Sequence, residues 1–562
     1  MRLYPAGKPS LTEVGSLPDF FGGNLTVPCR CLYSTKSFSP SQGKKVAMLI
    51  PVLSVKNRSL WLVFLHQVLY NLWDNSKICQ LEEGPGSGKE EVKMKSETKK
   101  TTLRKLLPML AVIAIPVALQ NLLTTTGSMV DTVMLATLGE KTVGAVGLCA
   151  QFTSLMFSCY WGFVGGGMLF FSQFWGAQDH ENIRRSYGIT LTAIMSVGIL
   201  FSLLALLFPE AVMHLYTSSV PISQIGVQYL KIVGFAFPLQ TYAMTISCCL
   251  RSIEQVRIPL AAGIVSVVTN CVCNYILIFG KLGLPAMGVR GAALGTVIAA
   301  AVNVLVLLAA VKKYHIPYIT EIKSHFRWNK ALFSQYMTKS MPIIANELGI
   351  GIGNMMIAVV LGHQADEAIA ATAVFRTLEG VIIAFFSGFS NAATVLVGKE
   401  VGAGNHEEAF DRAWRIIYLC SAMTALACGM LLLVHTPLFH AMGLRRESFR
   451  IATGMLVIFT FVSVIRMGNW AHNDTFRSAG DPGFGSVLEI LFMFLMVQPV
   501  IHIANDALHL PFLAVFALCY CDEPIRYVII QIHLYSRKWI RPVSAAGMAT
   551  IGEFREKYHV KL

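Results

Sequence analysis

Charged residues are scarce in this chain, and their scarcity excludes an ordinary soluble protein. Asp, Glu, Lys and Arg make up 14% of the 562 residues, whereas a soluble globular domain carries about 25%. Hydrophobic residues make up 54%, and long apolar runs recur from residue 106 to about residue 535. A helix that crosses a bilayer needs about 20 consecutive apolar residues. The sequence therefore predicts an all-α membrane protein that crosses the bilayer many times.

Recognisable catalytic and metal-binding motifs are also lacking. The chain contains no H-E-x-x-H, no G-x-S-x-G and no phosphate-binding loop, which are signatures of zinc peptidases, serine hydrolases and nucleotide-hydrolysing proteins. Most of the 13 cysteines stand alone or in adjacent pairs within apolar runs, as small packing residues do, and their spacing indicates neither a zinc site nor a disulfide framework. We therefore expect no enzyme and no cofactor, and an ion gradient as the energy source.

Basic residues outnumber acidic ones and give a formal net charge of +14, but we do not expect nucleic-acid binding. The basic residues gather in short loops between apolar runs, and cytoplasmic loops of membrane proteins are enriched in Lys and Arg in this way. The pattern predicts that both termini face the cytoplasm, although Lys281, Arg290 and the loop at 445–450 run against it. The loops that carry the prediction contain Arg184, Arg185, Arg251, Arg257, Lys312, Lys313, Arg537 and Lys538.

Twelve apolar runs are long enough to span a membrane, in two groups of six. Residues 1–93 differ in composition, and we expect an atypical or poorly ordered extension there. We predict an N-terminal six-helix lobe at 94–311, a cytoplasmic linker at 312–330, a C-terminal six-helix lobe at 331–535 and a cytoplasmic tail at 536–562. The predicted spans lie near 107–136, 143–173, 187–208, 223–250, 258–280, 288–311, 335–361, 368–398, 414–435, 452–475, 484–503 and 510–534.

The two groups of spans repeat each other at a constant offset of 226 residues without a gap. Six spans in each half give parallel repeats, related by an axis along the membrane normal. In transporters built this way, the substrate site lies near the bilayer midplane between the repeats. The sequence thus predicts two pseudo-symmetric six-helix bundles. The aligned pairs include Pro116 with Pro342, Gly162 with Gly388, Gly176-Ala177 with Gly402-Ala403, and Arg251-Ser252 with Arg477-Ser478.

One carboxylate lies inside the first predicted span. Asp131 follows an apolar, Thr-rich stretch that begins at Pro116. A charged residue in the middle of a membrane helix costs about 2.5–3.5 kcal/mol on insertion scales and usually serves an ion, a proton or a substrate. Its repeat counterpart is Ile357, so the fold does not require an acid there. We expect Asp131 to bind a coupling cation or to exchange a proton; burial against a structural partner is the alternative.

Several motifs resemble the multidrug and toxic compound extrusion (MATE) family, and its bacterial members most of all. They are P-x14-D-T-V-M-L at 116–135, the loops GAQDHENIRRS and GAGNHEEAFDRA, N-x3-N-x4-FG, and G-V-x-G-A-A-x-G-T, which ends at Thr296. The resemblance covers about residues 94–545. It implies a secondary antiporter that exports amphipathic, often cationic, organic compounds in exchange for Na⁺ or H⁺ as its two lobes rock.

The resemblance also implies a cation pocket in the N-terminal lobe. The family's first-helix aspartate matches Asp131, which would hold a transient Na⁺ or a proton, and Asn270, Asn274 and Thr296 match positions that help to form the pocket. Asn274 stands where many members carry a second aspartate, and amide and hydroxyl oxygens are suitable ligands for Na⁺ but poor proton acceptors. Asn270 and Asn274 lie one helical turn apart, so hydrogen bonds between membrane helices explain them nearly as well.

Further polar residues lie in the predicted C-terminal lobe. Glu347, with Asn346 before it, is the second intramembrane acid. The family often has a glutamate on its seventh helix, although several branches carry it three residues later, where this chain has Ile350. We expect Glu347 and Asn346 to contact the substrate or the coupling ion; a structural role is the alternative. Arg376 and Glu379, three residues apart on the eighth span, predict a structural ion pair.

Together these features predict a monomeric antiporter of the plasma membrane. Its expected partners are small-molecule substrates and the lipid bilayer, and not nucleic acid. The alternative is a lipid or polysaccharide-precursor flippase of a related fold. Such flippases usually place more basic residues toward the central cavity, whereas this chain offers Asp131 and Glu347. The sequence does not distinguish Na⁺ from H⁺ coupling.

Overall fold

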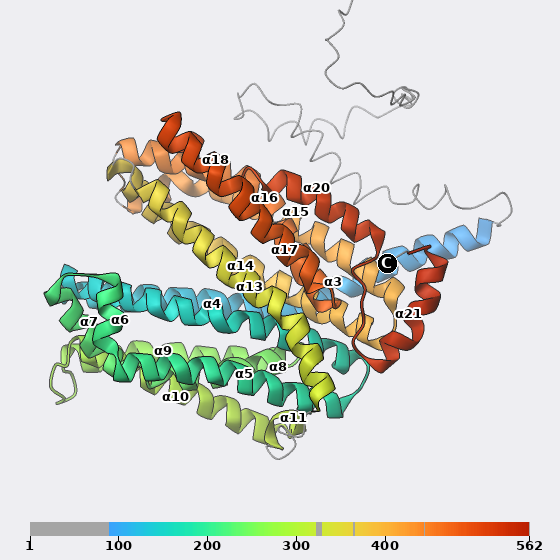
Figure 1. The fold of residues 1–562 in the computed structure, drawn as a ribbon, viewed down its shortest axis with the longest axis horizontal. Coiled ribbons are helices and arrows are strands. Elements are labelled where there is room, and N and C mark those ends of the chain that lie inside the picture. Colours follow the sequence, from blue (N-terminus) through green and yellow to red (C-terminus); the bar gives the residue numbers. More distant parts are fainter. Residues whose placement is uncertain (1–88, 322–328, 363–365, 443, 445, 561–562) are drawn as a thin grey trace, which may run out of the picture. The chain divides into compact units, whose positions relative to one another are not determined.

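The computed structural model describes residues 89–321, 329–362, 366–442, 444 and 446–560, and over these ranges it contains helices and no strands (Figure 1). All of them belong to one compact unit, Tyr70–Leu562. Residues 1–88 of the predicted extension and residues 322–328 of the predicted linker lie outside the described residues. The first helix begins at Lys89, five residues before the start predicted for the N-terminal lobe.

The described helices form two groups that follow each other along the chain. In Figure 1 most of each group lies on its own side, while α3 and α13 extend along helices of the other group, α14 and α4 respectively. We call α3 to α10 the N-lobe and α13 to α20 the C-lobe. The N-lobe contains α3 (Lys89–Ala136), α4 (Glu140–Gly176), α5 (His180–Leu207), α6 (Pro209–Tyr216), α7 (Val220–Val233), α8 (Ala236–Ser252), α9 (Arg257–Phe279) and α10 (Val289–Lys313). The C-lobe contains α13 (Lys330–Gly362), α14 (Asp366–Ala403), α15 (His406–Ala441), α16 (Arg446–Ser478), α17 (Pro482–Phe492), η2 (Met493–Val497), α18 (Gln498–His502), η3 (Ile503–Ala507), α19 (Phe512–Leu518) and α20 (Glu523–Ser536). Two short helices, α11 (Pro317–Thr320) and α21 (Ala545–Lys557), lie outside the lobes.

The number of continuous spans is slightly lower than the predicted twelve. Ten of the described helices are long and apolar enough to cross a membrane, and α7 with α8 makes an eleventh span that is bent by 51°. The run predicted at 510–534 instead forms α19 and α20. Asp522 and Glu523 interrupt its apolar pattern, and Pro524 cannot supply the N–H that a continuous helix needs there. The all-α membrane fold with two related bundles is confirmed, but its twelfth segment is broken.

The repeat is visible in how equivalent helices end. Glu254 (φ 66°) follows α8 and Gly480 (φ 94°) follows α16, both in the left-handed region. Gln178 (φ 56°) and Gly404 (φ 86°) hold the same positions after α4 and α14. The two members of each pair are 226 residues apart, so the two lobes adopt the same backbone conformation at these sites. The C-lobe has glycine at both, whereas the N-lobe holds larger residues in a conformation that glycine tolerates best.

The lobes meet where α4 crosses α14. A Cβ atom built on Gly176 would lie 1.9 Å from the carbonyl oxygen of Lys399, and one built on Gly402 would lie 1.9 Å from that of Gln173. Gln173 and Lys399 are repeat counterparts, so the crossing is self-complementary, and glycine lets the two backbones touch. Arg184 and Arg185 near the start of α5 and Arg412 near the start of α15 lie at the same end of the molecule as this crossing. We call it the basic end.

We expect Gly402→Ala to destabilise the protein, because the added methyl group would overlap the Gln173 backbone, which cannot rotate away as a side chain could. Overpacking of this kind costs about 1–3 kcal/mol. The melting temperature of the purified protein in detergent should fall by several degrees. Gly429→Ala in α15 is the matched control, since a Cβ there meets nothing within 4 Å. Equal melting temperatures for the two variants would contradict the close crossing.

Candidate functional site

Asp131 lies half-buried on α3, against two amides of α9. Asn274 Nδ2 donates to Asp131 Oδ1 at 2.8 Å. The Asn270 amide faces the same carboxylate; in the orientation that satisfies both of its amide atoms, its nitrogen donates to Asp131 Oδ1 at 2.7 Å and to Oδ2 at 3.0 Å. The two asparagines reach one carboxylate because they stand one turn apart on a single helix. No ion pair to Asp131 occurs among the described residues, so amides alone hold its charge.

Asn274 also brings an unused acceptor into the pocket. Its side chain is 1% exposed, and its Oδ1 atom has no hydrogen-bond partner. A Cβ built on Gly295 of α10 would lie 2.1 Å from that oxygen, so the glycine makes room for the amide. A buried oxygen without a partner is costly, and amide and carboxylate oxygens are the ligands that hard cations take. The Asp131 carboxylate and the free Asn274 Oδ1 atom are therefore oxygen ligands of the kind that a small cation takes, while the two amide nitrogens face the carboxylate in this structure.

Thr296 does not contact the Asp131 carboxylate directly. Its hydroxyl donates to the Ala292 carbonyl oxygen at 3.1 Å and interacts with the side chain of Tyr229 on α7, which itself lies within electrostatic range of Asp131. Sequence reasoning missed Tyr229. Its repeat counterpart is Met455, so the comparison of repeats that isolated Asp131 could also have identified Tyr229. The structure thus brings Asp131, Asn270 and Asn274 together and leaves Thr296 outside the direct contacts of the carboxylate.

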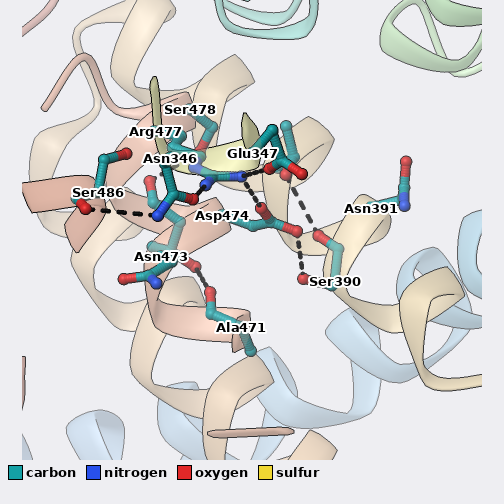
Figure 2. A network of polar contacts seen from close by, with 12 residues as sticks. Asn346, Glu347, Ser390, Asn391, Ala471, Asn473, Asp474, Arg477, Ser478 and Ser486 are labelled. Atoms are coloured by element: carbon teal, nitrogen blue, oxygen red, sulfur yellow. Dashed lines mark hydrogen bonds and ion pairs between the residues drawn. The ribbon is translucent and has the colours of Figure 1, made fainter. Parts of the chain in front are cut away.

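In the C-lobe, Glu347 and Asn346 face an arginine (Figure 2). Arg477 Nη1 lies 3.2 Å from Glu347 Oε1, and its Nη2 donates to Asn346 Oδ1 at 2.5 Å. Arg477 also lies 3.5 Å from Asp474 Oδ1, while Ser390 Oγ donates to Asp474 Oδ2 at 2.5 Å. Arg477 is 8% exposed. The charge of Glu347 is therefore balanced inside the protein, whereas that of Asp131 is not.

Polar contacts continue from this arginine to the broken twelfth segment. Glu489 on α17 accepts from Asn346 at 3.1 Å and pairs with Arg526 on α20 at 3.2 Å. Arg526 also pairs with Asp522 and with Glu523, each at 2.8 Å. Asp522, Glu523 and Arg526, at the start of α20, are each at most 6% exposed. One buried guanidinium therefore holds three carboxylates together.

The predicted pair of Arg376 and Glu379 is present as part of the same network. Arg376 Nη1 donates to Glu379 Oε2 at 2.8 Å, and Arg466 Nη1 donates to Glu379 Oε1 at 2.8 Å. Arg466 in turn lies 3.8 Å from Glu523. The sequence pointed to Arg376 with Glu379 because they are three residues apart; Arg466 is 87 residues from Glu379, and spacing gives no sign of that contact. The functional roles of Glu347, Asn346, Arg376 and Glu379 stay predictions.

Comparison with known proteins identifies relatives of the whole two-lobe region. A family model described as MatE matches residues 116–276 and 342–508, which lie in the N-lobe and the C-lobe respectively. The chain is 21% identical over 414 residues to an uncharacterized transporter, YisQ, of Bacillus subtilis, covering 73% of this chain and 90% of that protein. It is 29% identical over 317 residues to the probable multidrug resistance protein NorM of Agrobacterium fabrum, covering 55% and 66%.

Solved structures have the same fold. A transporter of the MOP superfamily from Pyrococcus furiosus superimposes with a TM-score of 0.69 at 16% sequence identity, over 76% of this chain and 96% of that one. A crystallised MATE protein in complex with MaL6 gives a TM-score of 0.69 at 15% identity, over the same shares of the two chains. These similarities extend over both lobes.

Proposed function

Because the chain belongs to the MatE family of membrane transporters, we propose that it is a secondary antiporter that exports small amphipathic, often cationic, organic compounds in exchange for Na⁺ or H⁺. The probable multidrug resistance protein among its bacterial relatives supports this substrate class. In this proposal the chain acts as a monomer in the plasma membrane with both termini in the cytoplasm. Lobes at 94–311 and 331–535 rock about the linker at 312–330.

The observation that carries the proposal is the uncompensated charge of Asp131. Its carboxylate is held by Asn270 and Asn274 and by no basic side chain within the described part of the chain. A bound cation or proton removes that charge and so lowers the cost of enclosing the group in the membrane. One carboxylate can be neutralised by the coupling ion or by a cationic substrate, but not fully by both. Exclusion of this kind makes the two fluxes run in opposite directions.

Dye efflux from proteoliposomes tests the proposal. Vesicles loaded with ethidium and containing the intact protein should lose dye when either an inward proton gradient or an inward sodium gradient is imposed, and the effective gradient identifies the ion. Protein-free vesicles measure the passive leak of ethidium, which is subtracted. No efflux of ethidium or of other cationic dyes from well-folded protein under either gradient would overturn the antiporter. Movement of a labelled lipid or lipid-linked sugar by that same preparation would point to the flippase.

A further inference from the structure

Gln173 and Lys399 are among the side chains that reach from one lobe to the other, and both lie at the basic end. Lys399 on α14 places its Nζ 2.9 Å from both carboxylate oxygens of Glu254, which follows α8. Gln173 on α4 donates from Nε2 to the Ser478 carbonyl oxygen at 2.8 Å, and its Oε1 accepts from the Val543 backbone N–H at 2.7 Å. Because Gln173 and Lys399 are repeat counterparts, each lobe contacts the end of the corresponding helix in the other, α16 in one case and α8 in the other.

Gln173 and Glu254 are both in unusual environments, and their contacts across the lobes account for them. Gln173 is fully buried, and the opposite lobe and the residues after α20 satisfy both of its amide atoms. Glu254 occupies a left-handed position where the C-lobe has glycine, a strained conformation for a residue with a side chain. Gln178 is likewise left-handed where the C-lobe has glycine. Its side chain donates to the Trp175 carbonyl oxygen, at the end of the helix that it follows, at 2.9 Å. The Glu254 carboxylate accepts from Trp175 Nε1 of its own lobe at 3.4 Å and also pairs across the lobes with Lys399.

The segment after α20 completes the contact. We call residues Arg537–Val560 the strap. Its backbone follows the C-lobe: Arg541 N–H donates to Ala479 O at 2.8 Å, and Ser544 Oγ donates to Gly402 O at 2.6 Å. Thr550 Oγ1 donates to Gly404 O at 3.1 Å. These bonds fix Val543 at the crossing of α4 and α14, where its N–H meets Gln173.

We propose that Glu254, Lys399 and Gln173, together with Val543 of the strap, form a gate that keeps the basic end closed. To open this end, α4 must separate from α14. These contacts oppose that movement, because they join α4 to the end of α16 and to the strap, and α14 to the residue after α8. The ion pair is part-exposed, with both side chains 29% accessible, and such pairs are weak individually. A gate made of one weak ion pair and one buried amide can therefore open reversibly when ion or substrate binding favours the other state. The inference rests on the proposed antiporter, because a gate is useful only if the lobes alternate.

Hydrogen exchange of the intact protein tests the gate. It is read from the amides of 252–256 in one segment and of Arg541, Val543 and Ser544 in the other, since residue 542 is proline. Lys399→Glu should make both segments exchange about fivefold faster, since repulsion from Glu254 replaces attraction. The swapped pair, Lys399→Glu with Glu254→Lys, should return exchange to within about twofold of the original. Lys557→Glu is the matched control: Lys557 pairs with Glu407 at the same end, but within the C-lobe and strap, so exchange at 252–256 should not change.

A second pair of variants separates the gate from simple stability. Glu254→Gly removes the carboxylate while relieving the strained backbone, so we expect faster exchange with no loss of melting temperature. Gln173→Leu should also speed exchange in both segments, because Ser478 O and Val543 N–H lose their partner. Unchanged exchange in both Lys399→Glu and Gln173→Leu would overturn the gate, even if dye efflux is found. Exchange that responds as expected in a protein that moves no dye would support a closing contact and count against the antiporter.

Discussion

Asp131→Asn is expected to abolish ion-driven dye efflux while leaving the protein folded. Asparagine matches aspartate in size and keeps a carbonyl oxygen that can accept from Asn274 and Asn270, so the packing of α3 against α9 should survive. It can neither release a proton nor neutralise a cation. If the charged contact contributes about 3 kcal/mol to cation binding, its loss weakens that binding by about a hundredfold. Efflux should then fall to the leak of protein-free vesicles under both gradients.

The control for this variant is Asp506→Asn. Asp506 lies exposed in η3, next to His502, and takes no part in the proposed pocket, so its substitution should leave efflux unchanged. Gel filtration in detergent checks that both variants remain monodisperse. Efflux at the original rate in Asp131→Asn would remove this residue from coupling and would leave Glu347 as the only other predicted intramembrane acid in that role.

Arg526→Met is expected to destabilise the C-lobe severely. Arg526 lies within 3.2 Å of Glu489, Asp522 and Glu523, and methionine would leave the three carboxylates facing one another. Removing one partner from a buried ion pair costs about 3–5 kcal/mol, and we expect the upper part of that range. The melting temperature in detergent should fall well below that of the original protein. Acidification should recover part of the loss, because protonated carboxyl groups no longer repel one another.

Arg450→Met provides the comparison. Arg450 lies in the first turns of α16, the helix that also carries Arg466 and Arg477. Its side chain is 80% exposed, and its distance to Glu447 is a long 3.6 Å. An exposed pair contributes about 0–1 kcal/mol, so the melting temperature should barely change. If Arg526→Met and Arg450→Met lowered the melting temperature equally, the three carboxylates would not depend on this guanidinium, and the network would be weaker than its distances indicate.

The sequence predicts the parts of this protein that depend on local pattern. Apolar run length predicts nearly all of the spans, and the constant offset predicts two related bundles. Asp131 is conspicuous because it interrupts an apolar helix whose counterpart has Ile357. Asn270 and Asn274 follow from helical spacing. In each of these cases the information lies within one helix or in the comparison of two aligned ones.

Other features depend on how distant helices are rotated against each other, which no local pattern encodes. Arg477 lies 130 residues from Glu347, and nothing in either segment shows that they meet. The average hydrophobicity of the run from Phe512 to Leu534 predicts one continuous span, although Pro524 marks a break in it. Val543 of the strap lies in what was predicted only as a tail, and its contact with Gln173 spans 370 residues.

The charged network of the C-lobe also constrains how the chain enters the membrane during synthesis. Each of Arg466, Glu489 and Arg526 adds about 2.5–3.5 kcal/mol to the insertion cost of its own segment when it lies near the bilayer centre and lacks a partner. The partners of α20 lie on α16 and α17, which emerge from the ribosome earlier. Glu489 on α17 therefore lacks its arginine until α20 has been made. A nascent chain cut short before Glu523 would leave Glu489 without its arginine, whereas Arg466 would still pair with Glu379.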